Sequence, residues 1–112
     1  MGQLTSITVD CKDAEALAAF WVQVLDGYET DAEWKMVLNS LTGPTIYFQG
    51  VPEPKIGKNR LHLDMQVDDR AAEVERLQGL GATVFAEHDE GGHRWTVMQD
   101  PEGNEFCVTQ RA

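Results

Sequence analysis

The chain repeats one pattern of predicted elements, and this internal repeat constrains the fold more than any other feature. Residues 4–10 predict a strand, and Asp13 begins a predicted helix; residues 61–67 and Asp69 repeat the same order. Each copy by itself would leave one face of its sheet uncovered. A chain of this length is also too short for two independent cores. We therefore expect both copies to form one domain, residues 1–112.

Each repeat contains a helix pattern in which apolar residues recur every three or four positions. The first helix is predicted from Asp13 to near Leu25, and the second from Asp69 to near residue 80. Both aspartates can accept hydrogen bonds from the free backbone N–H groups at a helix start. Gly27 and Gly81 can adopt the left-handed conformation that ends a helix.

Three short strand patterns follow each predicted helix. They cover residues 27–31, 34–39 and 45–49 in the first repeat, and residues 83–87, 94–99 and 105–109 in the second. Between the repeats, residues 51–59 form a predicted linker with two prolines that do not suit a central strand. We expect an α+β fold of two βαβββ modules, about 3–50 and about 60–110. They should form a curved mixed sheet with both helices on its convex face.

Side chains alternate between the two faces of a strand, so each predicted strand has one apolar and one polar face. In residues 45–49, for example, Ile46 and Phe48 oppose the polar side chains. The polar faces hold Tyr47, His62 and Cys107 rather than the Lys and Glu that usually line a solvated face. These faces could simply meet water, but we favour a concave polar face that lines a ligand cavity.

The formal net charge of −10 restricts the classes of partner. Nucleic-acid binding needs clustered Lys and Arg, so we expect no nucleic-acid partner. An acidic surface can attract cationic ligands, or it can serve solubility alone. Two cysteines, Cys11 and Cys107, form neither a disulfide framework nor a zinc motif. Without a long apolar run or a signal-peptide pattern, we expect a cytoplasmic protein with no membrane partner.

Several short motifs together resemble the vicinal oxygen chelate superfamily, the group of glyoxalases, bleomycin-resistance proteins and extradiol dioxygenases. The resemblance covers the whole chain, and its specificity comes from the order and spacing of the motifs. They are residues 20–21 and 25–28, residues 61–64 and 67–69, residues 80–82 and residues 100–106. Residues 51–55 and 105–108 are similar to a small glyoxalase-like subgroup.

The resemblance implies a divalent metal held by side chains from four strands, and most of these positions are changed in this chain. The usual first-strand His falls on Ser6, and the fourth-strand acid falls on Tyr47 or Gln49. His62 keeps its usual type, and the last-strand Glu falls on Cys107. His62 and Cys107 could still attract zinc, but a catalytic site needs about three protein ligands and the sequence offers no evident third. We therefore predict no metal and no cofactor, with Ser6, His62 and Cys107 as degenerate positions.

These considerations predict a metal-independent small-molecule binding protein of the glyoxalase/bleomycin-resistance type, with no assigned catalytic residues. Its ligand, cationic or aromatic, should lie on the polar concave sheet face against Ser6, Thr8, Tyr47, Gln49, His62, Asp64, Trp95 and Cys107. The alternative is a divergent lyase or isomerase with a degenerate metal site, or one that uses His62 with Asp64 or Glu105 in acid–base catalysis.

Two further expectations concern assembly and a loop. The short chain and the open, polar sheet of one copy favour a homodimer, as in relatives that pair to complete their cavities. His88 and His93 flank residues 89–92, where a flexible Gly-rich hairpin is favoured over an opportunistic metal site.

Overall fold

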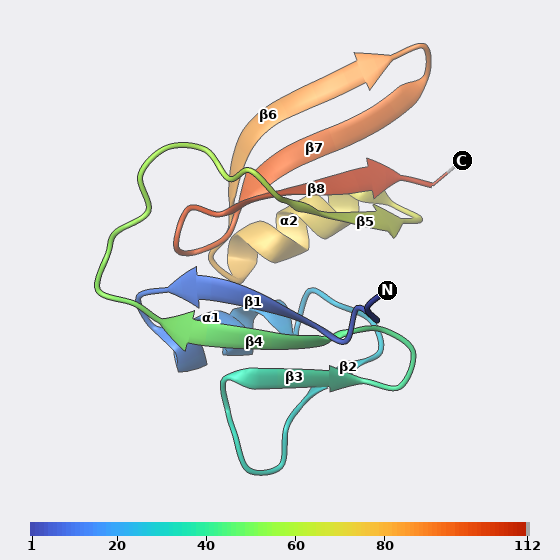
Figure 1. Ribbon diagram of the computed structural model, residues 1–112. Coiled ribbons are helices and arrows are strands. Elements are labelled where there is room, and N and C mark those ends of the chain that lie inside the picture. The colour runs from blue at the N-terminus through green and yellow to red at the C-terminus, as the bar shows by residue number, and fades with distance from the viewer. Residues whose placement is uncertain (112) are drawn as a thin grey trace. The chain divides into compact units, whose positions relative to one another are not determined.

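A computed structural model describes residues 1–111 (Figure 1). The chain divides into two compact units, Met1–Lys55 and the part from Ile56 onward, here called module one and module two. Each contains a strand, a helix and three further strands. The predicted α+β class with paired βαβββ modules is therefore confirmed, and each module forms a mixed four-stranded sheet.

Module one places its helix on one face of its sheet. Its elements are β1 (Ser6–Cys11), α1 (Ala14–Trp21), β2 (Tyr28–Thr30), β3 (Val37–Ser40) and β4 (Thr45–Gly50). The strand order is β1-β4-β3-β2, with β1 parallel to β4 and the other pairs antiparallel. The helix α1 contacts β4 and β1. Leu17 of the helix and Ile46 and Phe48 of β4 are buried and belong to the core of this module.

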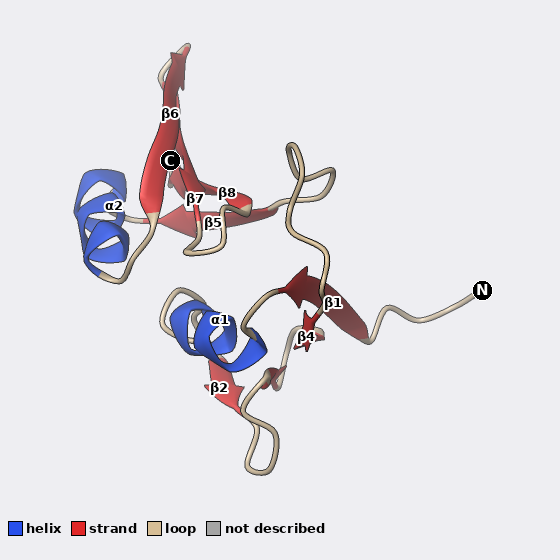
Figure 2. Ribbon diagram, turned by 90° about the vertical axis from the view of Figure 1, so that its left-hand side faces the viewer, coloured by secondary structure: helices blue, strands red, loops and turns tan. Residues whose placement is uncertain are grey.

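Module two repeats this arrangement. Its elements are β5 (Leu63–Val67), α2 (Arg70–Gly79), β6 (Thr83–Glu90), β7 (His93–Gln99) and β8 (Glu105–Gln110). The strand order is β5-β8-β7-β6, with β5 parallel to β8 and the other pairs antiparallel. Figure 2 shows α2 beside one face of this sheet, where it contacts β6, β7 and β8.

A polar contact identifies the sheet face that α2 covers. Arg70 at the start of α2 donates from Nη1 to Oγ1 of Thr96 at 2.6 Å. Thr96 pairs with Val108 across β7 and β8, so both side chains face the helix. Thr96, Val108, Phe106 and Leu77 of α2 have no exposed surface. Alternation then places residues 105, 107 and 109 on the opposite face of the sheet.

Both helices begin where the sequence predicts. Asp13 accepts a hydrogen bond from the backbone N–H of Ala16 at 3.1 Å, and Asp69 accepts one from Ala72 at 3.0 Å. The first helix ends at Trp21, earlier than predicted, and a turn carries the chain onward. Among residues 1–111, no helix is long and apolar enough to cross a membrane.

The strand predicted at residues 34–39 begins later, at Val37. The Asp31 carboxylate accepts hydrogen bonds from the backbone N–H groups of Glu33 and Trp34, at 2.9 and 3.0 Å. These bonds satisfy backbone donors locally and hold this segment in a turn. An aspartate side chain therefore overrides the strand pattern that Trp34 begins.

The hairpin of β6 and β7 is longer than the sequence patterns predict. Its strands extend to Glu90 and from His93, so only Gly91 and Gly92 connect them. These glycines have φ angles of +61° and +82°. Two successive positive φ angles are typical of the two-residue turn that matches the twist of paired strands. The predicted Gly-rich hairpin is present, but Asp89 and Glu90 belong to β6 and only Gly91 and Gly92 form its turn.

Candidate functional site

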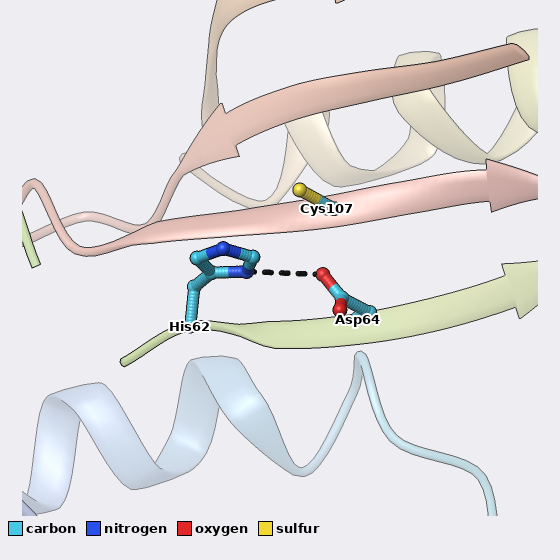
Figure 3. A group of neighbouring side chains, drawn as sticks. All are labelled: His62, Asp64 and Cys107. Carbon is cyan, nitrogen blue, oxygen red and sulfur yellow. Dashed lines mark hydrogen bonds and ion pairs between the residues drawn. The ribbon is translucent and has the colours of Figure 1, made fainter. Parts of the chain in front are cut away.

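A compact polar cluster lies on the face of the second sheet opposite α2. Asp64 of β5 pairs in register with Cys107 of β8, so both side chains share this face. His62 lies two residues before Asp64, and a spacing of two returns a side chain to the same face. Figure 3 shows the three side chains gathered at the neighbouring strands. We call His62, Asp64 and Cys107 the donor cluster.

Within the donor cluster, Nδ1 of His62 lies 3.0 Å from Oδ1 of Asp64 (Figure 3). The tautomer with a proton on Nδ1 donates to the carboxylate and leaves the other ring nitrogen as an acceptor. The side chain of His62 is 41% exposed and that of Asp64 is 61% exposed. Asp64 therefore orients an imidazole ring that an external molecule can reach.

Cys107 is the buried member of the donor cluster. Burial, followed by a hydrogen bond and the charge of Asp64, raises the pKa of the thiol to about 11, against a smaller opposing effect of Lys58. The thiol is therefore protonated at neutral pH and donates to the carboxylate. A protonated, buried thiol is a poor nucleophile, so this residue contributes hydrogen bonding rather than covalent chemistry.

The donor cluster differs from the four-strand metal site that the family resemblance implies. The hydroxyl of Ser6, the phenol of Tyr47 and the amide of Gln49 replace its usual imidazole and carboxylate ligands. In module two, by contrast, one donor atom from each member of the cluster lies within 4.8 Å of the others. Asp64 is a third potential metal ligand; sequence reasoning placed it against the small molecule but not among the metal positions. The usual metal arrangement therefore does not fit this chain.

Glu105 shares the face of Cys107, and both are more buried than a solvated polar face would be. Their exposed fractions are 6% and 9%. One oxygen of Glu105 accepts a hydrogen bond from the backbone N–H of Asn59 at 3.0 Å. This bond ties the end of the predicted linker to the start of β8. It also occupies one carboxylate oxygen of Glu105, which the alternative function uses in acid–base catalysis.

Trp95 lies on the same face, one strand beyond β8, where it pairs with Thr109. Its ring stacks on His88, with centroids 4.8 Å apart and planes 15° apart. The ring of His93 also lies beside Trp95, with centroids 5.3 Å apart and planes at 46°. Sequence reasoning missed both imidazole partners. The Gly91-Gly92 turn was the available signal, because a two-residue turn there pairs His88 with Trp95.

The predicted site residues of module one also share one face. Thr8 pairs with Tyr47 across β1 and β4, and Ser6 and Gln49 lie on the same face of these strands. The side chains of Thr8, Tyr47 and Gln49 are exposed. The structure thus gathers the eight predicted site residues into two sets, one in each module.

The strand registers make three positions of these sets equivalent. Ser6 corresponds to His62 in the sequence repeat, which places Thr8 on Asp64. Thr8 pairs with Tyr47 as Asp64 pairs with Cys107, in parallel register. The donor cluster of module two therefore has a counterpart of three hydroxyl groups in module one.

Comparisons with known proteins agree with this architecture. Residues 6–109 match the family described as a glyoxalase-like domain. No curated protein sequence matches significantly. A glyoxalase/bleomycin resistance protein/dioxygenase family enzyme from Burkholderia phytofirmans PsJN is a structural neighbour, with a TM-score of 0.72 and 21% identity. The alignment covers 97% of this chain and 98% of that chain.

Two other solved structures are similar to the same extent. A member of this superfamily from Sphaerobacter thermophilus DSM 20745 has a TM-score of 0.70 and 19% identity, with 99% of this chain and 98% of that chain covered. Oxidase ChaP-H2 has a TM-score of 0.72 and 19% identity, with 99% and 94% covered. These neighbours share the fold, and the family match spans nearly the whole sequence. The chain therefore belongs to the glyoxalase-like domain family of the vicinal oxygen chelate superfamily.

Proposed function

We propose that this protein binds a small organic molecule on its polar sheet faces and that this binding needs no metal. The observation that carries the proposal is the contact of 3.0 Å between His62 and Asp64, on the face opposite α2. Asp64 already holds the ring, so a ligand that hydrogen-bonds to His62 does not have to order it. A hydrogen bond of this kind contributes about 1 kcal/mol, and more when one partner is charged.

The surroundings favour a cationic or aromatic ligand. Asp64 is exposed and carries a carboxylate, and the chain as a whole has a net charge of −10. Trp95 is half-buried on the same face and offers an aromatic surface. A cation or a flat ring gains from contact with an indole, and a cation also gains from the acidic field.

The proposal assigns contact roles to both sets of predicted residues. In module two these are the donor cluster and Trp95, with His62 as the main hydrogen-bonding group. In module one they are the hydroxyl and amide groups of the half-buried Ser6 and of the exposed Thr8, Tyr47 and Gln49. We further propose that the working state is a cytoplasmic homodimer, because a second copy would shield these polar faces from bulk water.

A second candidate function is metal-independent acid–base catalysis by His62. The same contact supports it, because a carboxylate that orients an imidazole is a common arrangement around a general base. On this alternative the protein is a divergent lyase or isomerase. The two candidates differ in one result, since a binding protein returns its ligand unchanged and an enzyme converts it.

The test is native mass spectrometry of the purified protein after incubation with a metabolite extract of its source organism. We expect a bound small molecule on the wild type, a slightly weaker signal on Cys107→Ser and a signal weakened about fivefold or more on His62→Ala. Glu75→Ala, an exposed change on α2, is the matched control and should bind like the wild type. Prior dialysis against a chelator should not weaken the signal.

Two results would overturn this proposal. Binding that persists fully in a folded His62→Ala variant would remove the donor cluster from the site. Binding that disappears after chelation and returns with a divalent ion would contradict metal independence. Analysis of the released compound then separates binding from catalysis, because an altered mass or isomer indicates turnover.

A further inference from the structure

We propose that His62, Asp64 and Cys107 form a site for one thiophilic divalent cation of the zinc class, contained within module two. This site is not the four-strand arrangement that the family resemblance implies, because Asp64 supplies a ligand and module one supplies none. The inference goes beyond the proposed function and does not depend on it. An ion would engage the same atoms as the proposed ligand, so the ion-loaded and ligand-bound states should exclude each other.

The donor atoms of the cluster lie almost as close together as the ligand atoms around a bound ion. One nitrogen, one oxygen and one sulfur lie within 4.8 Å of one another. Around tetrahedral zinc, with bonds of about 2.0–2.3 Å, ligand atoms lie about 3.5 Å apart. The cluster must therefore contract by roughly 1 Å to hold such an ion.

The side chains that must move are free to do so. His62 and Asp64 are 41% and 61% exposed, and His62 lies just before the edge strand β5. Cys107 is buried on β8, which lies between β5 and β7 and is hydrogen-bonded to both. The sulfur thus provides a fixed point, toward which rotation of the imidazole and carboxylate can close the site.

The chemistry of the donors selects the kind of ion. Imidazole nitrogen and thiolate sulfur suit zinc, cobalt and nickel, whereas magnesium and calcium prefer oxygen ligands alone. Three protein ligands leave a fourth position for water, because two of the three side chains face solvent. The carboxylate of Asp64 adds a negative charge at the site, and Lys58 is the opposing charge nearby.

Binding of the ion requires a balanced exchange of protons. The Cys107 thiol is protonated at neutral pH, so formation of the metal–sulfur bond breaks the S–H bond and releases one proton to solvent. The hydrogen bonds of Asp64 to His62 and to the thiol are replaced by bonds to the ion. Neither an oxidant nor a reductant takes part.

The experiment is a titration of the metal-free protein with Co²⁺, followed by optical absorption. A cobalt–thiolate bond gives a charge-transfer band in the near ultraviolet, which a site without sulfur lacks. We expect a saturable band at one ion per chain that Zn²⁺ removes and excess Mg²⁺ does not. Release of one proton per ion, measured in a weakly buffered solution, should accompany it.

Matched variants assign the ligands. Cys107→Ser should abolish the band, and Cys11→Ser, which changes the other buried cysteine, should retain it. Asp64→Asn and His62→Ala should weaken Co²⁺ binding by about tenfold or more. These two positions are exposed, so their variants test the site even if Cys107→Ser fails to fold.

The opposite results would overturn the inference. A wild-type protein without a saturable band, a band that survives in Cys107→Ser, or one lost in Cys11→Ser would each contradict it. Equal Co²⁺ affinity of the wild type and of Asp64→Asn would remove the carboxylate from the site. A failure here leaves the proposed function intact, because that test follows the binding of an organic ligand and not of an ion.

Discussion

Asp64 on β5 lies in register beside Cys107 on β8, and its carboxylate is hydrogen-bonded to the thiol on the sheet face opposite α2. Burial first, and then this carboxylate, raises the pKa of the thiol from 9.0 to about 11. A group whose pKa is raised by folding stabilises the fold in its protonated form. That stabilisation is complete below the unfolded pKa and is lost as the pH rises through the folded pKa.

The free energy of unfolding should therefore decline between pH 9 and pH 11 through Cys107. We expect a loss on the order of 1–2 kcal/mol from this group. Urea unfolding of the wild type at a series of alkaline pH values measures the decline. Cys107→Ser has no thiol at this position, so its stability should fall less over the same range; parallel curves would contradict the assignment.

Changes at the exposed donors should cost little stability. His62→Ala should change the free energy of unfolding by no more than about 0.5 kcal/mol, because the side chain is exposed. Phe106→Ala, on the buried face of β8, should instead cost about 3–5 kcal/mol. Chemical denaturation of both variants gives the comparison. A His62→Ala variant as unstable as Phe106→Ala would identify the histidine as structural.

The contact between Arg70 and Thr96 should contribute measurably to the docking of α2. Thr96→Val keeps the shape of a fully buried side chain but removes the acceptor of the 2.6 Å hydrogen bond. The guanidinium already has one buried nitrogen without a partner among residues 1–111, so we expect a loss of about 1–3 kcal/mol. Thr109→Val, on the opposite face, is the control.

A double variant separates the lost bond from other effects of Thr96→Val. Adding Arg70→Met removes the donor together with its acceptor. The double variant should therefore lose less free energy of unfolding than the two single variants lose together. Thermal denaturation of all four proteins provides the double-mutant cycle. Strict additivity would show that the two side chains do not interact.

Two glycines of module two should respond to alanine in opposite directions. Gly92 has a φ of +82° in the hairpin turn, with open space around the position of a Cβ atom. Gly92→Ala should therefore cost about 1 kcal/mol through backbone strain alone. Gly79, at the end of α2, has equal space and no positive φ, so Gly79→Ala should stabilise by up to about 1 kcal/mol. Unfolding curves of both variants decide the signs.

The proposed homodimer makes a simple prediction about mass. The chain is 12.5 kDa, so light scattering at micromolar concentration should give about twice this value. Dilution should shift the mass toward the monomer if the association is reversible. A constant monomer mass across the whole concentration range would contradict the proposal.

The sequence was a good guide to elements whose signals are local. Asp13 and Asp69 begin their helices as predicted, and the alternation predicted for β4 matches its burial, with Ile46 and Phe48 buried and Tyr47 exposed. Local signals also misled, because Asp31 binds the backbone beyond it and delays β3. Propensity patterns do not reveal such competition between a side chain and a strand.

The donor cluster required information that the sequence does not hold. The spacing of His62 and Asp64 indicates a shared face, but their proximity to Cys107 depends on the register of β5 and β8. A shift of one residue would turn the thiol to the other face. The burial of Glu105 and Cys107 likewise depends on where distant segments, such as the one at Asn59, come to lie.

The matched registers of the two sheets have a consequence for how this scaffold can diversify. Thr8 and Tyr47 occupy in module one the positions that Asp64 and Cys107 occupy in module two. Thr8, Tyr47 and Asp64 are exposed, so these three side chains can be exchanged with little disturbance of packing, whereas Cys107 is buried. A duplicated half can thus acquire ionisable groups while its sister keeps neutral ones. New chemistry can thus arise on one face of a strand, while the residues on its other face keep the helix packed against the sheet.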